Sequence, residues 1–343
     1  MATRPTIRQG DEGEHVVTVQ ECLQPEAGLV DGDFGPRTED AVRKFQVREA
    51  LEVDGIVGPM TWDALDSVYG LPPYIGPLPV GLPPPLSPEL VSKICALAMA
   101  SPVAEFNWPD RGMMPPGYTK GMCLTYAGVV MRWHSHDSAA TEMAKANTHN
   151  SDKDVLSWYA GKFEELGFSN DEAGLDTLRH LWMLIHGLGP CESSGRHCEG
   201  RDTSVPVGYY GDPSTTTEAG MFQTSWDAHS CSNEIDKLFD TWSPSLELER
   251  GFPQCYLDTF REGVSCSSTA WECYGSGDGY THQELSKACP PYHAEMTAIG
   301  LRNLRKHWGP VGRYEVTLNP DVDTLYQAIE KLLTEDVLTR PIA

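Results

Sequence analysis

Hydrophobic side chains recur three and four positions apart through most of this 343-residue chain. This spacing places them on one face of a helix, whereas a strand would alternate at every second residue. In the segment 171–186, for example, Leu175, Leu178, Trp182 and Ile185 follow one another at helical intervals. We therefore expect a mainly α fold, with helices over residues 14–22, 38–49, 61–68, 89–100, 152–166, 171–186, 292–308 and 321–333.

Two nearly repeated segments, 30–38 and 53–61, mark the first part of the chain. Each begins Val-Asp-Gly, places a second glycine three residues later and continues Pro-x-Thr. Glycine supplies the positive φ that a tight turn needs, and proline and threonine are typical of the first turn of a helix. The repeat therefore predicts two units of turn and helix that pack with the earlier helix at 14–22.

These residues resemble the three-helix peptidoglycan-binding domain. The match covers essentially all of residues 1–70, and most of the matching positions serve turns, helix caps and the core. The resemblance implies that residues 1–70 hold the chain on the glycan strands of peptidoglycan. The matching residues are Gly10, Gly13, Val17, Gln20, Leu23, Asp31, Gly32, Phe34, Gly35, Thr38, Ala41, Val42, Phe45, Gln46, Val53, Asp54, Gly55, Val57, Gly58, Thr61 and Trp62.

A proline-rich stretch separates this segment from the rest of the chain. Residues 71–89 contain eight prolines, which fix φ and favour an extended, semi-rigid spacer; a docking peptide for a proline-reading partner is the alternative. We therefore expect a domain at 1–70, a linker at 71–89 and a larger, mostly helical domain at 90–343. Inside it, the long loops 187–219 and 262–281 are candidates for function or for stabilisation by cysteines.

The densest group of candidate functional residues follows the helix that is expected to end near residues 186–190. Glu192 lies just beyond it, followed by Ser193, Ser194 and Gly195. Cleavage of a glycosidic bond needs a carboxylic acid that is still protonated near neutral pH, and burial raises the pKa of a carboxyl group. Glu192 is therefore the candidate general acid, and its small neighbours leave room for a sugar.

A second segment, Gly220-Met221-Phe222-Gln223, follows about 25 residues later. A glycine lets the backbone approach a ligand closely, and a glutamine amide suits a sugar hydroxyl or N-acetyl group. Over about forty residues, the two segments resemble goose-type lysozymes and soluble lytic transglycosylases, with Glu192 at the position of the catalytic acid. The resemblance implies a lysozyme-like domain, and the substrate-binding candidates are Ser193, Gly220, Met221, Phe222 and Gln223.

The sequence departs from this family in two places that affect the reaction. Phe222 replaces the usual third residue of the Gly-Leu-Met-Gln segment, and Ser225 stands where many goose-type enzymes have an aspartate. A carboxylate that activates water must then come from elsewhere. A lytic transglycosylase needs no such base, because a hydroxyl of the substrate attacks, so a base would favour hydrolysis. The candidates are Glu218, Asp202, Asp212 and Glu199, with Glu218 favoured.

The sequence thus favours a muramidase, a glycosidase that hydrolyses the β-1,4 bond between N-acetylmuramic acid and N-acetylglucosamine. A lytic transglycosylase that forms 1,6-anhydro ends and a chitinase-like hydrolase are open alternatives. Aromatic residues in loops commonly stack on sugar rings, and the candidates here are Tyr209, Trp226, Tyr210, Trp271 and Tyr280.

Two further alternatives are a zinc peptidase or amidase and a non-enzymatic wall-binding protein. His134 and His136 would share one face of a strand and could bind zinc together with His149 or a carboxylate. The chain has no HExxH motif, so a pair of exposed histidines on a polar loop is the simpler interpretation. We expect no metal and no cofactor.

Net charge and cysteine content limit the binding partners and the cellular location that we expect for this protein. The net charge is −23, with −8 in residues 1–70 and −15 in the remainder, which disfavours nucleic acid. Nine of the ten cysteines follow residue 90 without a CxxC pair, which favours disulfides and an oxidising destination. From the apolar pattern we expect neither a membrane span nor a secretory signal at the N-terminus. We expect a monomer that acts outside the cell or is delivered to a target periplasm.

Overall fold

The computed structural model describes residues 4–69, 82, 85–204, 206–248 and 251–335. The chain divides into two compact units, Met1–Leu78 and Pro79–Ala343, here called the N-terminal unit and the larger unit. Within the described residues, β-structure is limited to isolated bridges, so the predicted mainly α fold is confirmed. The expected linker at 71–89 lies largely outside the described residues. Among the described helices, none has both the length and the hydrophobicity needed to cross a membrane.

Three helices form the N-terminal unit: α1 (Glu14–Cys22), α2 (Pro36–Arg48) and α3 (Pro59–Tyr69). The predicted repeat is visible in their order, since a turn precedes both α2 and α3. Each helix begins at the proline of the repeat, two residues before the predicted start at Thr38 or Thr61. The hydrophobic faces meet in one core, which includes Val16, Val19, Phe34, Val42, Phe45, Trp62 and Leu65.

A buried glutamine organises each of the two turns. In the first, the Gln20 amide nitrogen donates to the Asp31 carboxylate at 2.8 Å, and its oxygen accepts the N–H of Gly32 at 2.9 Å. In the second, Gln46 donates to the Asp54 carboxylate at 2.7 Å and accepts the N–H of Gly55 at 2.9 Å. The repeat in sequence is therefore also a repeat in hydrogen bonding, which satisfies both buried amides.

The larger unit is built from short and long helices around one core. The helices are α4 (Pro88–Ala100), α5 (Pro116–His134), α6 (Ser138–Met143), α7 (Val155–Trp158), α8 (Ala160–Glu165), α9 (Leu175–Ser193), α10 (Pro213–Thr216), α11 (Asn233–Trp242), α12 (Leu257–Phe260), α13 (Gly277–Ala288), α14 (Pro290–Asn303), α15 (Gly309–Gly312) and α16 (Pro320–Leu333). Single 3-10 turns lie at Pro102–Glu105, Trp226–Cys231, Ser243–Glu247, Pro253–Cys255, Ser268–Trp271 and Arg305–His307.

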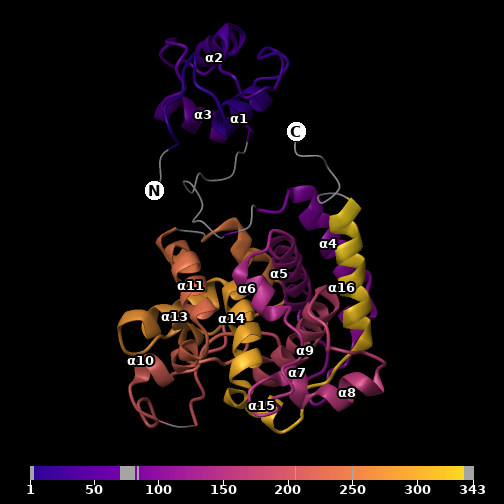
Figure 1. Cartoon of the computed structure of the whole chain (residues 1–343). Helices are drawn as coiled ribbons and strands as arrows, with labels where there is room; N and C mark the ends of the chain where they lie inside the picture. Colours follow the sequence, from indigo (N-terminus) through magenta and orange to yellow (C-terminus); the bar gives the residue numbers. More distant parts are fainter. Residues whose placement is uncertain (1–3, 70–81, 83–84, 205, 249–250, 336–343) are drawn as a thin grey trace. The chain divides into compact units, whose positions relative to one another are not determined.

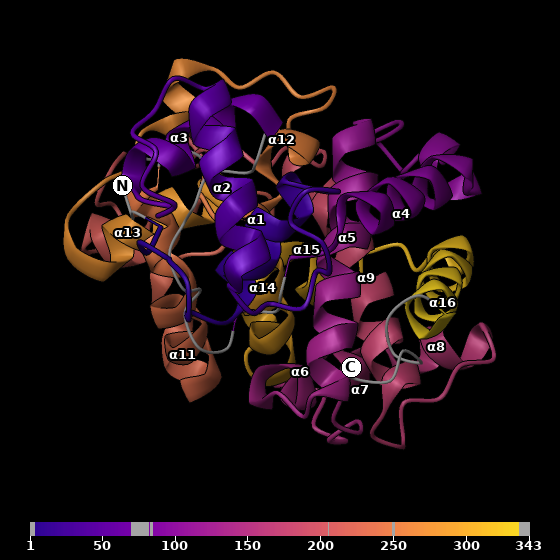
Figure 2. The same cartoon turned by 90° about the horizontal axis from the view of Figure 1, so that it is seen from above.

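Helix α9 lies in the middle of this unit and carries the candidate acid at its end. It packs against α5, α14 and α16 (Figure 1), and α4 packs against α5 and α16 (Figure 2). Near its start, the buried Arg179 bonds Asp323 of α16 at 2.6 Å and Glu330 at 3.0 Å. These ion pairs fix α9 against α16, so the end of the helix has a defined position.

The helix predictions need several corrections. The segment 152–166 forms two short helices, α7 and α8, because Tyr159 leaves helical geometry between them. The segment 292–308 ends as a helix at Asn303. Helix α5 was not predicted, because it is buried on nearly all sides and so has no hydrophobic stripe with a polar opposite face.

The disulfides expected from the cysteine content are present in the larger unit. Two disulfides form in the larger unit, Cys198–Cys266 and Cys255–Cys289. The first joins the loop 187–219 to the loop 262–281, as expected for long loops held by cysteines. The remaining cysteines are free: Cys22, Cys95, Cys123, Cys191, Cys231 and Cys273.

Candidate functional site

Helix α9 continues past a proline to bring Glu192 to its last turn. Pro190 lacks the N–H that would bond the carbonyl of His186, and the buried hydroxyl of Tyr118 donates to that carbonyl at 2.7 Å instead. The Tyr118 ring fits because residue 189 is glycine: a Cβ there would lie 2.3 Å from the tyrosine oxygen. The predicted end near residues 186–190 was therefore too early.

The helix then ends abruptly after Ser193. Ser194 adopts the left-handed conformation with φ 56°, and its N–H donates to the carbonyl of Pro190 at 3.1 Å. The Ser193 hydroxyl is buried and donates to the carbonyl of Gly189 at 3.2 Å. The predicted role of Ser193 in substrate binding thus competes with a role in holding this turn.

The environment of Glu192 favours its protonated form. Burial raises its pKa to about 8, and the negative charge of Glu218 adds to the increase. The guanidinium groups of Arg313 and Arg111 oppose this increase, but they do not reverse it. A carboxyl group with this pKa is mostly protonated at pH 7, as a general acid must be.

The segment Gly220–Gln223 forms a tight loop close to Glu199. Ala219 and Thr224 form an antiparallel bridge at its base, and the N–H of Gly220 donates to the carbonyl of Glu199 at 2.8 Å. Gly220 has a φ of +72°, and a Cβ there would lie 2.5 Å from Nδ1 of the buried His293. Glycine is therefore required at this position by both conformation and space.

The other residues of this loop point largely inward. Met221 and Phe222 are fully buried, and the Phe222 carbonyl accepts the indole N–H of Trp308 at 3.2 Å. The amide nitrogen of Gln223 donates to the carbonyl of Gly220 at 2.9 Å. The side chains of Met221 and Phe222 thus anchor the loop, and neither residue is exposed to a ligand.

Glu218 and Asp202 line one cavity of about 160 Å³, together with Arg201, Tyr209, Tyr210 and Thr217. Burial raises the pKa of Glu218, and the negative charges of Asp202 and Asp227 raise it further. The hydroxyl and N–H of Ser204 hold the pKa of Asp202 below its ordinary value. The cavity therefore has an ionised aspartate beside a glutamate that binds its proton more tightly than usual.

The remaining predicted residues lie away from this cavity. Trp226 is buried and stacks on His229 with ring centroids 4.5 Å apart. Asp212 caps α10 by accepting the N–H of Ser214 at 2.9 Å, and the carboxylate of Glu199 pairs with Arg196. These groups support the local structure, so Glu218 and Asp202 remain the better candidates for the second carboxylate.

Residues close to these carboxylates also include some that sequence reasoning missed. Asp227 accepts the Ser225 hydroxyl at 2.6 Å, and the same hydroxyl lies 3.4 Å from Nε2 of His307. A carboxylate thus lies two residues after Ser225, within hydrogen-bond distance of its hydroxyl. Arg111 and Arg313 carry no motif, and they are separated from Glu192 by many residues in the sequence, so no local signal identifies them.

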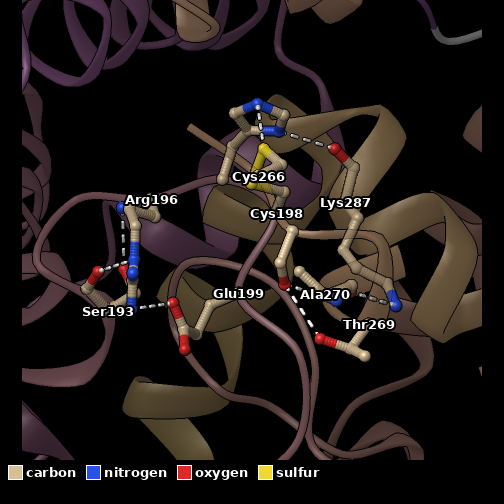
Figure 3. The surroundings of a disulfide bond; sticks show 10 residues. Ser193, Arg196, Cys198, Glu199, Cys266, Thr269, Ala270 and Lys287 are labelled. Carbon is tan, nitrogen blue, oxygen red and sulfur yellow. Dashed lines mark hydrogen bonds and ion pairs between the residues drawn. A yellow bond between two sulfur atoms is a disulfide. The ribbon is translucent and has the colours of Figure 1, made fainter. Parts of the chain in front are cut away.

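The histidines of the zinc alternative do not lie on a strand. His134 is the last residue of α5, and His136 lies in the following turn with φ 58°. Among the described residues, one group has three donors within metal-binding distance, namely His197, Cys198 and Cys266. Its two cysteines are bonded to each other (Figure 3), which leaves one imidazole and no thiolate.

Comparison with known proteins identifies the first part of the chain. Residues 12–65 match the family described as "Putative peptidoglycan binding domain". An uncharacterised protein from the bpoA1 3′ region of Kitasatospora aureofaciens is 46% identical over 68 residues, which are 19% of this chain and 58% of that protein. The zinc D-Ala-D-Ala carboxypeptidase of Streptomyces albus G is 37% identical over 65 residues, which are 18% of this chain and 26% of that enzyme. The matches thus span less than two thirds of either relative.

Among solved structures, the Burkholderia AP3 phage endolysin aligns over 95% of this chain and 100% of that chain, with 14% identity and a TM-score of 0.17.

Proposed function

We propose that the larger unit is a muramidase and that the N-terminal unit holds it on the cell wall. The proposal rests mainly on Glu192, whose pKa of about 8 suits a general acid at neutral pH. The match of residues 12–65 to a peptidoglycan-binding domain supports peptidoglycan as the polymer that is bound. The motif resemblance to goose-type lysozymes and soluble lytic transglycosylases supports cleavage of the bond between N-acetylmuramic acid and N-acetylglucosamine.

In this mechanism one glutamate donates a proton and the other accepts one. Glu192 donates its proton to the oxygen of the departing N-acetylglucosamine as the glycosidic bond breaks. Ionised Glu218 removes a proton from a water molecule, which then attacks the anomeric carbon. Asp202 remains ionised and helps to set the pKa of Glu218, while the exposed ring of Tyr209 offers a surface for a sugar.

The proposed muramidase differs from the alternative enzymes in the glycan ends that it produces, in its independence of metal and in its preferred polymer. A muramidase releases fragments with a reducing muramic acid, whereas a lytic transglycosylase releases 1,6-anhydro ends, which mass spectrometry distinguishes. A zinc peptidase or amidase loses its activity in a chelator and leaves the glycan strand intact. A chitinase-like enzyme cleaves purified chitin faster than purified peptidoglycan.

The test of Glu192 is the variant E192Q, which keeps the shape of the side chain but removes its transferable proton. We expect cleavage of purified peptidoglycan to fall at least ~100-fold, while sedimentation with insoluble wall is unchanged. The matched control is E164Q, at an exposed glutamate on α8, which should cleave like the unaltered protein. Undiminished cleavage by E192Q would overturn the proposal, and no cleavage by the unaltered protein would favour a wall-binding protein.

A further inference from the structure

A rigid turn holds one guanidinium group against the end of α9. Trp108 and Gly112 exchange backbone hydrogen bonds of 3.0 and 3.1 Å, and the buried indole of Trp108 stacks on His186 of α9 with ring centroids 5.9 Å apart. Between them, the exposed Arg111 donates from Nη2 to the carbonyl of Cys191 at 2.7 Å. The turn therefore places this cation beside the last turn of α9.

The same segment also contacts the residues that follow the candidate acid. Met114 is buried, and its sulfur would lie 3.1 Å from a Cβ built on Gly195. The stretch from Trp108 to Met114 thus packs along the end of α9 and the turn after it. Arg111 bonds the residue next to the candidate acid, although it lies 80 positions before Cys191 in the sequence.

The two cations near Glu192, Arg313 and Arg111, have different hydrogen-bond partners. Arg313 is neutralised, because its Nε and Nη2 bond the two carboxylate oxygens of Glu315 at 2.7 and 2.9 Å. Arg111 bonds a carbonyl oxygen, and no carboxylate of the described residues lies within ion-pair distance of it. Such a cation is unusual in a part of the chain that carries a net charge of −15.

The charge of Arg111 also opposes the role of Glu192. A nearby cation stabilises the ionised carboxylate, so it lowers the pKa of the general acid. An anion bound to Arg111 would cancel this effect and would leave Glu192 protonated when the substrate is in place. Peptidoglycan carries suitable anions, because its stem peptides have free carboxylates and because the lactyl group of muramic acid is a free carboxylate wherever no stem peptide is attached to it. Chitin has none.

We propose that Arg111 is a specificity-determining residue that binds a carboxylate of peptidoglycan next to the bond that is cleaved. This inference rests on the proposed function, and it adds the chemical group by which the site distinguishes peptidoglycan from a neutral polymer. The carboxylate belongs either to the lactyl group of muramic acid or to the stem peptide.

The test measures kcat/KM of the full chain and of R111Q on three forms of one polymer. The first is intact peptidoglycan, the second is glycan strand stripped of its stem peptides, and the third is peptidoglycan with its carboxyl groups converted to methylamides. Glutamine can still donate to the Cys191 carbonyl, so R111Q removes the charge and spares this contact. On intact peptidoglycan we expect R111Q to lose about ten- to a hundred-fold, mainly through a higher KM.

On the amidated polymer, R111Q and the unaltered protein should have equal kcat/KM, because the anion is gone. A loss confined to intact peptidoglycan identifies a carboxylate of the stem peptide. A loss on stripped strands identifies the lactyl carboxylate, which is freed when the stem peptide is removed. Equal losses on all three forms would overturn the inference, since Arg111 would then act only on the structure of α9. Absence of cleavage by the unaltered protein would instead contradict the proposed function.

Two further variants serve as matched controls. R111K keeps the charge and should recover much of the preference for the charged polymer. R313Q also removes a cation near Glu192, but this cation is already bound by Glu315, so its effect on the preference should be less than about threefold. If R313Q changed the preference as much as R111Q, a general effect of charge would explain both and the inference would be wrong.

Discussion

The N-terminal unit and the candidate site both bury polar groups, but the surroundings of these groups differ. Gln20 and Gln46 are surrounded by donors and acceptors that satisfy their amides. Glu192 and Glu218 are instead placed where burial and neighbouring negative charge raise the pKa of both. Buried polar groups with satisfied partners stabilise a fold, whereas buried like charges cost stability and are typical of reaction centres.

Glycine substitutions should also affect stability differently in the two regions. The largest expected loss is that of G220A in the larger unit. In G220A, a methyl group would meet the buried His293 ring and the carbonyl of Ser286, at 2.5 and 2.9 Å from its carbon. The positive φ adds to this cost, so we expect the larger unit to lose at least ~3 kcal/mol of its free energy of unfolding. Chemical denaturation, followed by hydrogen exchange in each unit, measures the loss.

The matched variant in the N-terminal unit is G10A. Gly10 also has a positive φ, of +94°, but a Cβ there meets nothing within 4 Å. Its cost should therefore be about 1–2 kcal/mol, from backbone strain alone. Equal losses in G220A and G10A would show that the space around Gly220 relaxes, and the loop would then be less rigid than we infer.

An effect smaller than that of G220A is also expected from Q46A in the N-terminal unit. The substitution leaves the Asp54 carboxylate and the N–H of Gly55 without their buried partner. We expect this unit to lose about 1–3 kcal/mol and the larger unit to be unchanged. If hydrogen exchange near Gly55 were the same in Q46A, the shared network would not hold the turn.

The sequence predicted the fold best where local rules decide it. The Val-Asp-Gly repeat predicted both turns of the N-terminal unit and placed both helix starts within two residues, because glycine, proline and threonine act over a short range. Helix α5 was missed because a helix buried on nearly all sides has no period to detect. The end of α9 was placed too early because the helix passes Pro190, and only the distant Tyr118 makes this possible.

The candidate site was predictable in part for the same reason. Glu192 and Gly220 belong to short motifs, so the sequence alone singled them out. Arg111 acts from a turn 80 positions before Cys191, and tertiary packing alone brings it to the site. Met221 and Phe222 were assigned to substrate binding from the motif, but burial of their side chains is decided by contacts with residues such as Trp308.

The most direct test of the role of Glu192 is the pH dependence of kcat/KM for cleavage of purified peptidoglycan. Because its pKa is about 8, Glu192 keeps its proton below that pH and loses it above. Cleavage should therefore fall tenfold per pH unit above about pH 8, and the residual activity of E192Q should lack this decline. Cleavage that stays constant up to pH 10, or a decline that persists in E192Q, would contradict the assignment of Glu192 as the general acid.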